Sequence, residues 1–456
     1  MPTSPFIASI PSGFCFGSDY WQWIGRLPQH TAKVHAKYGD IVRLAPNELS
    51  FANPQAWTDI YAKLPGKEQW PRNPRRVPQG KNGLKSMMNT AGSDHARFRR
   101  LLNHAFSEKG LQKQQGLITK YIDLFIKRVD EFAQTGEPVD LTKWFGMVGF
   151  DIISDLGWSE TFNCVKRGEP HSWMKTFVGT AFDTQLKFLF REHGLLWLAP
   201  FLIPMRLQLS RFENFKYARQ RVEDRIQNGG IRGDFWDRIA IKSADDNASG
   251  EGLTKEEMIV AAVTLVGTGS ETISTVLAGL VYFLGTNHYA MKKLVQEIRT
   301  SFASPAEINL VSVHKLTYLT ACLNETMRLE EPQRVASSSQ KELRSTCHLA
   351  ELPKIPPTSI DLANTVLSVS CRTPPAEFAH DNKAAFHPFS MGAFNCLGQN
   401  LAQAEARLIM AKLLWHYDLE HGQKTPVDWL DQKSFAVFSK KELYVRFTRG
   451  QNLPPN

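Results

Sequence analysis

A cysteine near the carboxyl end of the chain has neighbours that suit metal chemistry. In the stretch FSMGAFNCLGQNLA, Cys396 follows Gly392 by four residues and precedes Gly398 by two. From Leu397 to Trp415, apolar residues recur at steps of three and four, which predicts an amphipathic helix that begins at or just after the cysteine. A helix N-terminus stabilises a thiolate, and the two glycines would let the backbone approach a flat, bulky object. These features favour an iron-binding thiolate, whereas the alternative is that Cys396 is a small buried hydrophobe.

A second set of polar residues interrupts an apolar segment. The stretch GTGSET contains Gly269, Glu271 and Thr272, and each glycine costs a helix roughly 1 kcal/mol. We therefore expect a groove lined with Glu271 and Thr272. One alternative is that the glycines serve close packing while Thr272 bonds back to its own helix. Another is a phosphate-binding loop, but the lysine of a P-loop and the strand before it are both missing.

The helix that carries these residues has a recognisable start. Thr254 and Glu257 have the spacing of a capping box, and the apolar segment after them extends to Gly285. Because this segment is apolar nearly all round, we expect it to be the buried central helix of a helical domain.

A third pair of polar residues lies on a helix with an apolar stripe. Glu325 and Arg328 are three residues apart on one face and can form an ion pair. Such a pair by itself is a common feature of exposed helices. The stripe consists of Leu316, Leu319, Leu323 and Met327, and Pro332 is expected to end the helix.

Composition restricts the class of protein. The chain has 456 residues, of which 42% are hydrophobic, and 28 Phe and 11 Trp can fill a large core. The net charge of +9 comes from basic residues scattered among acidic ones, which favours a basic docking face over a nucleic-acid site. Six cysteines without a C-x-x-C pair are too dilute for a disulfide framework and indicate reduced thiols.

The elements around these residues are mostly helical. Two short strands are predicted at Ile41–Ala45 and Glu48–Phe51, on either side of a Pro46-Asn47 turn. The stretch ELYVRF alternates Leu443, Val445 and Phe447 with polar residues, which predicts another half-buried strand. The fold class is therefore mainly α with a small β region.

Two segments bear on membrane contact. The amino-terminal stretch MPTSPFIASIPSGFCFGSDYW lacks a basic region and a long apolar core, so we expect neither a signal peptide nor an anchor there. The apolar run from Gly194 to Pro204 is about half the roughly 20 residues that a spanning helix needs. It fits either the core or a surface that touches a membrane through Trp197, Phe201 and Leu202.

Taken together, these motifs resemble a known family. F-x-x-G-x-x-x-C-x-G near the carboxyl end, E-x-x-R before it and G-S-E-T in a central helix, in this order, are similar to cytochrome P-450, the haem-thiolate monooxygenases. The stretch DHARFRRLLNHAF also matches, and the details resemble fungal enzymes of secondary-metabolite biosynthesis. The resemblance implies a triangular helical prism around haem b, with residues 26–450 as a single domain between a segment 1–25 and a tail 451–456.

The resemblance also implies roles for individual residues. Cys396 would be the axial ligand of the haem iron, and His95 and Arg99 would bind the propionates. Glu271 and Thr272 would manage protons during oxygen activation, and the thiolate would push electron density onto the iron. The full set of expected site residues is Gly269, Glu271 and Thr272 for catalysis, His95, Arg99, Phe389, Gly392 and Gly398 for the cofactor, and Cys396 for the metal.

Partners follow from the same resemblance. Electrons would come from NADPH through a cytochrome P-450 reductase, and the substrate would be an apolar small molecule such as a terpenoid or polyketide intermediate. Hydroxylation or epoxidation is the expected reaction. The expected location is peripheral, on the cytosolic face of the endoplasmic reticulum, with membrane contact through Gly194 to Pro204 and no nucleic-acid partner.

Besides the expected absence of the usual membrane anchor, the chain departs from the family pattern in two places. Phe394 stands where the family usually has an arginine that contacts a propionate. The family's Pro-Glu-Arg-aromatic segment, whose arginine completes a triad with Glu325 and Arg328, is not found before Ala379, which indicates an internal deletion. Arg334 and Arg372 are candidate substitutes. A second interpretation is therefore a degenerate, haem-poor member of the fold that binds a small molecule without catalysis.

Overall fold

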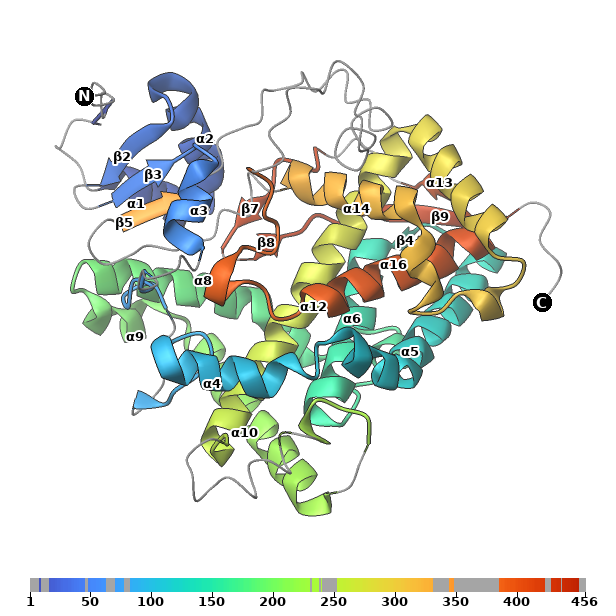
Figure 1. Ribbon diagram of the computed structural model, residues 1–456, viewed down its shortest axis with the longest axis horizontal. Coiled ribbons are helices and arrows are strands. Elements are labelled where there is room, and N and C mark those ends of the chain that lie inside the picture. Colours follow the sequence, from blue (N-terminus) through green and yellow to red (C-terminus); the bar gives the residue numbers. More distant parts are fainter. Residues whose placement is uncertain are drawn as a thin grey trace.

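The computed structural model describes residues 8–9, 16–45, 48–62, 70–77, 83–229, 232–237, 239, 252–330, 344–347, 385–422, 428–435 and 437–450. Helices fill most of this structure, and the strands are short (Figure 1). The expected fold class, mainly α with a small β region, is confirmed. The helices are α1 Phe16–Trp23, α2 Leu27–Tyr38, α3 Gln55–Tyr61, α4 Gly92–Asn103, α5 Glu108–Thr135, α6 Leu141–Trp158, α7 Cys164–Arg167, α8 Ser172–Glu192, α9 Ala199–Leu202, α10 Met205–Asn228, α12 Lys255–Thr286, α13 His288–Ser301, α14 Thr317–Glu330 and α16 Gln399–His416.

The strands form three small sheets in the described residues. The first has the order β1-β2-β3-β5, with β2 antiparallel to β3, and the second has the order β4-β9-β6. Both strands predicted near the amino terminus are confirmed with their bounds. The half-buried strand predicted in ELYVRF is confirmed as β9, in which Val445 and Phe447 are buried, and Leu443 is buried just before it. The strands are β1 Ala8–Ser9, β2 Ile41–Ala45, β3 Glu48–Phe51, β4 Val139–Asp140, β5 Arg344–Cys347, β6 Tyr417–His421, β7 Lys433–Ser434, β8 Phe438–Ser439 and β9 Tyr444–Arg449.

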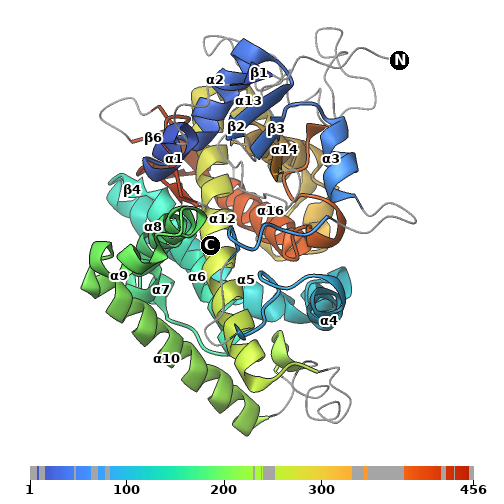
Figure 2. The same ribbon diagram turned by 90° about the vertical axis from the view of Figure 1, so that its left-hand side faces the viewer.

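Helix α12 runs through the centre of the molecule (Figure 2). It begins at the predicted capping box, in which the Glu257 backbone N–H donates to Thr254 Oγ1 at 3.2 Å and the Thr254 N–H donates to Glu257 Oε2 at 2.9 Å. Its length and hydropathy would allow it to span a membrane, but 67% of its most apolar window is buried by the rest of the protein. Packing against α6, α14 and α16 therefore accounts for its apolar composition.

Glycines let α6 and α12 approach each other closely. A Cβ on Gly269 of α12 would lie 2.6 Å from Ile153 Cγ1, and a Cβ on Gly149 of α6 would lie 2.6 Å from Ile273 Cγ2. Each helix thus places a glycine against an isoleucine of the other. The packing explanation, which the sequence left open, accounts for Gly269.

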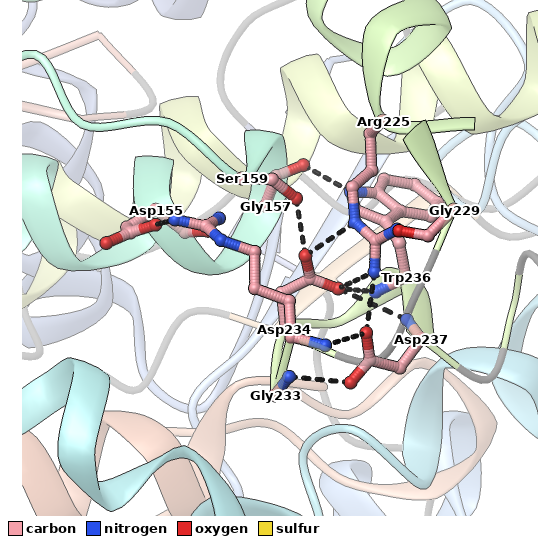
Figure 3. A network of polar contacts seen from close by, with 10 residues as sticks. Asp155, Gly157, Ser159, Arg225, Gly229, Gly233, Asp234, Trp236 and Asp237 are labelled. Atoms are coloured by element: carbon pink, nitrogen blue, oxygen red, sulfur yellow. Dashed lines mark hydrogen bonds and ion pairs between the residues drawn. The ribbon is translucent and has the colours of Figure 1, made fainter. Parts of the chain in front are cut away.

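A buried polar network holds the carboxyl-terminal end of α10 against α6 (Figure 3). Arg225 of α10 donates to Asp234 Oδ2 at 2.8 Å and to Asp237 Oδ1 at 2.6 Å, and Ser159 Oγ also donates to Asp234. The indole N–H of Trp236 donates to the Gly157 carbonyl at the end of α6. Because charge-assisted hydrogen bonds in a buried site are strong, this end of α10 has a fixed position.

Candidate functional site

Cys396 lies in a loop between a 3₁₀ turn, Gly392–Phe394, and helix α16. The Cys396 backbone N–H donates to the Phe389 carbonyl at 2.8 Å, and the Asn395 N–H donates to the Gly392 carbonyl at 3.3 Å. Gly398 is the N-cap of α16, so the helix begins just after the cysteine, as the apolar periodicity predicts. The two bonds fix the backbone before the sulfur, and helix α16 fixes the backbone after it.

Glycine is present at positions 392 and 398 of the motif for different physical reasons. Gly392 has φ +73°, and a Cβ there would lie 1.7 Å from the Tyr61 carbonyl oxygen of α3, so no other residue fits. A Cβ on Gly398 would meet no protein atom within 4 Å. The loop is therefore pinned to α3 at Gly392, whereas Gly398 faces open space at the start of α16.

Exposure separates Cys396 from the other cysteines whose side chains the structure describes. Cys164 and Cys322 are buried, while Cys396 is exposed. Burial raises the pKa of the Cys164 thiol to about 12 and also raises the pKa of Cys322. Those two cysteines remain neutral thiols in the core, which leaves Cys396 as the candidate metal ligand among the three.

A cluster of basic side chains adjoins the cysteine loop. Arg99 of α4 donates to the Asn395 carbonyl at 3.1 Å and to Asn395 Oδ1 at 2.6 Å. The ring centroid of His95, also on α4, lies 4.7 Å from that of Phe394, and the guanidinium of Arg72 lies 4.0 Å from the same centroid. Helix α4 thus brings both predicted propionate partners to the loop that carries Cys396.

The electrostatics of this basic cluster favour an anionic ligand. Burial, together with the charges of Arg72 and Arg99, lowers the pKa of His95 to about 4, so its imidazole is neutral at physiological pH. Burial also lowers the pKa of Arg72 to about 10, and Arg99 acts in the same direction. In the described part of the chain, neither arginine forms an ion pair with a carboxylate. Partly buried arginines that have no carboxylate partner among the described residues fit a ligand that brings its own carboxylates, as haem does with its propionates.

Sequence reasoning missed Arg72. The stretch WPRNPRR contains three arginines, and their spacing does not show which of them would lie beside the cysteine loop. In the structure Arg75 and Arg76 both reach Glu192, at 3.9 and 3.7 Å, whereas Arg72 donates to the Met88 carbonyl at 3.0 Å and stacks on Phe394. The only sequence indication was the substitution at Phe394, which predicted that a positive charge was missing there.

On α12, Glu271 and Thr272 have separate partners. Glu271 is buried, and its carboxylate pairs with Lys440. Thr272 is exposed, and its hydroxyl donates to the Thr268 carbonyl at 3.0 Å. No hydrogen bond among the described residues joins Glu271 to Thr272. The back-bonding alternative is therefore present for Thr272, and it leaves the hydroxyl oxygen able to accept a hydrogen bond from another group.

The Glu325–Arg328 pair on α14 is a buried ion pair rather than a solvent-exposed one. Arg328 Nε donates to Glu325 Oε2 at 2.7 Å, and its Nη2 donates to Oε1 at 2.6 Å. The Glu325 side chain is fully buried and that of Arg328 is 17% exposed. The candidate substitutes Arg334 and Arg372, and the position where the Pro-Glu-Arg-aromatic segment was sought, lie outside the described residues.

The apolar run from Gly194 to Pro204 lies largely at the surface. Trp197, Phe201 and Leu202 are 65, 82 and 57% exposed, whereas Ala199 and Ile203 are buried. The core alternative is therefore wrong for the three large side chains. Exposed apolar residues continue into the first turns of α10, and we call the whole set the apolar surface: Trp197, Phe201, Leu202, Met205, Leu209 and Phe212.

Comparisons with known proteins place this geometry in context. The family model described as Cytochrome P450 matches residues 11–352 and 374–447. The chain is 66% identical to the cytochrome P450 monooxygenase vrtK of Penicillium aethiopicum over 451 residues, which cover 95% of this chain and 84% of the relative. It is 38% identical to the versicolorin B desaturase stcL of Emericella nidulans, covering 92% and 88%, and 33% identical to the averantin hydroxylase of Aspergillus parasiticus, covering 92% and 87%.

The family match is interrupted between residues 352 and 374. This interval adjoins the place where the Pro-Glu-Arg-aromatic segment was expected, so the interruption fits an internal deletion. The cysteine loop, α4, α12 and α14 all lie within the matched residues.

Proposed function

Since this chain belongs to the cytochrome P450 family and is a haem-dependent monooxygenase, we propose that it oxidises a polyketide or terpenoid intermediate of secondary metabolism. The reaction class is hydroxylation or epoxidation. One atom of O₂ enters the substrate, and the other leaves as water with two electrons from a redox partner and two protons. The printed names of two relatives, a versicolorin B desaturase and an averantin hydroxylase, support oxidation of a small molecule from such a pathway.

The observation that carries the proposal is the basic cluster beside the cysteine loop. Cys396 would ligate the iron, and Arg72, His95 and Arg99 would hold the two propionates. The neutral imidazole of His95 would donate one N–H, because its lowered pKa keeps it uncharged. Phe389 and Gly392 would keep the loop in place through the backbone contacts described above, and Gly398 would leave room for the cofactor. Thiolate-ligated haem supplies the oxygen chemistry.

Carbon monoxide spectroscopy tests this function against the haem-poor alternative. The purified chain, reduced and saturated with carbon monoxide, should show the Soret shift that is diagnostic of thiolate ligation. Lack of any haem band in a protein that is folded by circular dichroism would instead favour a non-catalytic small-molecule binder.

Arg72 would take the place of the family's arginine at the position of Phe394. Its guanidinium lies over the Phe394 ring, so a charge from a distant segment occupies the region that the usual side chain would reach. The ring also shields the arginine from water, which strengthens its interaction with an anion.

Replacement Arg72→Leu should therefore weaken haem binding. A lost charge-assisted hydrogen bond costs about 1.5–3 kcal/mol, which is roughly a ten- to hundredfold increase in the dissociation constant. Titration of the apoprotein with haem, followed by Soret absorbance, measures the constant. Arg75→Leu is the matched control, because Arg75 is half exposed and pairs with Glu192. Equal constants for Arg72→Leu and the parent would remove Arg72 from the site.

Thr272 and Glu271 would handle the protons of the reaction. The Thr272 hydroxyl is exposed on α12 while it donates to the Thr268 carbonyl, so its oxygen can accept from water and relay a proton. The buried carboxylate of Glu271 is the adjacent ionisable group.

Thr272→Ala should leave haem binding intact but divert electrons to hydrogen peroxide. Positioned proton transfer contributes about 10²–10⁴ to rates, and we expect product per NADPH to fall at least about tenfold. Peroxide and product are measured together with a substrate that the parent converts. Thr264→Ala is the control, because Thr264 makes the same bond to the carbonyl four residues before it, at 2.8 Å. An unchanged ratio in Thr272→Ala would contradict this role.

Cytochrome P-450 reductase would supply the electrons from NADPH.

The apolar surface would place the enzyme peripherally on the cytosolic face of the endoplasmic reticulum. Large apolar side chains that are more than half exposed favour a lipid interface. The polar network at the other end of α10 (Figure 3) would keep this surface in a fixed orientation.

The variant Trp197→Ser/Phe201→Ser/Leu202→Ser should lose binding to phosphatidylcholine vesicles. Partial burial of three large apolar side chains is worth about 3 kcal/mol or more, which is roughly a hundredfold in partition coefficient. Vesicle co-sedimentation measures the coefficient. Tyr289→Ser is the control, because Tyr289 is 68% exposed on α13, far from α9 in Figure 1. Equal partition of the triple variant and the parent would remove the apolar surface as the contact.

A further inference from the structure

Lys440 reaches Glu271 from a hairpin that is distant in sequence. It directly follows β8, and its ammonium group contacts Glu271 Oε2, Ser274 Oγ at 2.6 Å and the Glu271 carbonyl oxygen at 3.3 Å. The side chains of Lys440 and Glu271 are only 10 and 6% exposed. An ammonium group has three donors, and these three acceptors match them.

The other end of the β7–β8 hairpin contacts α1 and α8. The Ser434 N–H donates to the Gly25 carbonyl at 2.9 Å, just after α1. The Phe435 ring packs edge to face against Phe182 of α8, with 5.2 Å between centroids. A Cβ on Gly25 would lie 2.7 Å from the same ring, so the Phe435 side chain is closely packed. The hairpin therefore connects α8, which leads toward the apolar surface, to the middle of α12.

The partners of Glu271 determine what its carboxylate can do. Consecutive residues on a helix differ by about 100° in direction, and here Glu271 is buried against Lys440 while Thr272 is exposed. The ammonium group of Lys440 contacts both Glu271 Oε2 and Ser274 Oγ, so the ion pair holds the carboxylate on the face of α12 that carries Ser274 rather than on the face that carries Thr272. Its use as a proton donor or acceptor beside Thr272 thus depends on the lysine.

We propose that Lys440 is a positioning residue that holds the Glu271 carboxylate away from Thr272, and that displacement of the β7–β8 hairpin releases it. The inference rests on the proposed proton-handling role of Glu271. It assigns the hairpin a function, because the same short segment packs Phe435 against α8 and ends at Lys440, which binds Glu271 on α12. Two events would displace the hairpin. One is contact of the apolar surface with a membrane, and the other is entry of a substrate between the hairpin, α8 and α12.

The infrared stretching band of carbon monoxide on the reduced haem protein tests the position of Glu271. This band responds to charges and proton donors near the bound gas. Lys440→Met should shift the band or add a second one, Lys440→Arg should retain the parental band, and Lys440→Met/Glu271→Gln should remove the new feature. Lys441→Met is the matched control, because the neighbouring lysine donates to the Asp428 carbonyl at 2.7 Å, and within the described residues no hydrogen bond joins its side chain to α12.

Each outcome decides the proposal. An unchanged band in Lys440→Met overturns it, and so does a shift that persists in the double variant, because the effect then bypasses Glu271. If Lys440→Met does not fold, Ser274→Ala removes one acceptor of the ammonium group and should give a smaller shift in the same direction, whereas no shift overturns the proposal.

Haem loading of the parent separates this proposal from the proposed function. If the parent protein binds no haem, the monooxygenase function is contradicted. The Lys440–Glu271 ion pair is then tested by measurements on the haem-free protein. A double-mutant cycle of Lys440→Met and Glu271→Gln on the thermal midpoint should show that the two changes are not additive. Additive changes would overturn the role of Lys440.

Discussion

Cys396→Ser is expected to abolish the thiolate-type spectrum of the reduced, carbon-monoxide-bound protein, even if some haem stays bound. A neutral hydroxyl is a poor ligand for iron compared with a thiolate. The backbone of the loop should not change, because its position depends on the bond from the Cys396 N–H to the Phe389 carbonyl and on the packing of Gly392 against Tyr61. Loss of the spectrum would then report on the sulfur alone.

A matched control for this variant is Cys322→Ala. Cys322 is fully buried in α14, so its replacement should leave the spectrum of the remaining haem protein unchanged. If Cys396→Ser kept the parental spectrum, the ligand would have to be another cysteine, and Cys15, Cys347 and Cys371 would be the next to replace.

Arg328→Met is expected to cause a large loss of stability. It leaves the fully buried carboxylate of Glu325 without the guanidinium that donates to both of its oxygens. Removing one partner of a buried pair costs about 3–5 kcal/mol, a large share of a total stability of roughly 5–15 kcal/mol. Urea unfolding followed by circular dichroism measures the free energy of unfolding.

Arg219→Met is the control for the buried pair. Arg219 lies 3.7 Å from Glu223 four residues later on α10, and both side chains are at least 30% exposed. Exposed pairs contribute about 0–1 kcal/mol, so this variant should be close to the parent. The double variant Glu325→Gln/Arg328→Met should recover part of the loss, because it removes the buried carboxylate together with the guanidinium that binds it. A loss below about 1 kcal/mol in Arg328→Met would contradict the buried role.

Local features of the chain could be predicted from the sequence. The capping box at Thr254 and Glu257, the helix after Cys396 and the strands Ile41–Ala45 and Glu48–Phe51 depend on residues close together in the chain. Hydrophobic periodicity and capping chemistry act over a few residues. The cysteine motif is equally local, so its family could be identified before the fold was known.

Contacts between distant segments could not be predicted in this way. The stacking of Arg72 on Phe394, the bonds from Lys440 to Glu271 and the approach of Gly392 to Tyr61 each join elements far apart in the chain. A periodic pattern shows which face of a helix is buried but not which element covers it. For the same reason the exposure of Trp197, Phe201 and Leu202 was left open.

The sequence by itself determined the family, the cysteine loop and the central helix, because these follow from the order and spacing of residues along the chain. Only the tertiary structure decided that Arg72 stands beside Phe394, that Gly269 serves the packing of α6 on α12, and that Glu271 is held by Lys440. Burial and charge at each of these positions come from side chains that packing brings together, and their effects on binding and proton transfer depend on that proximity.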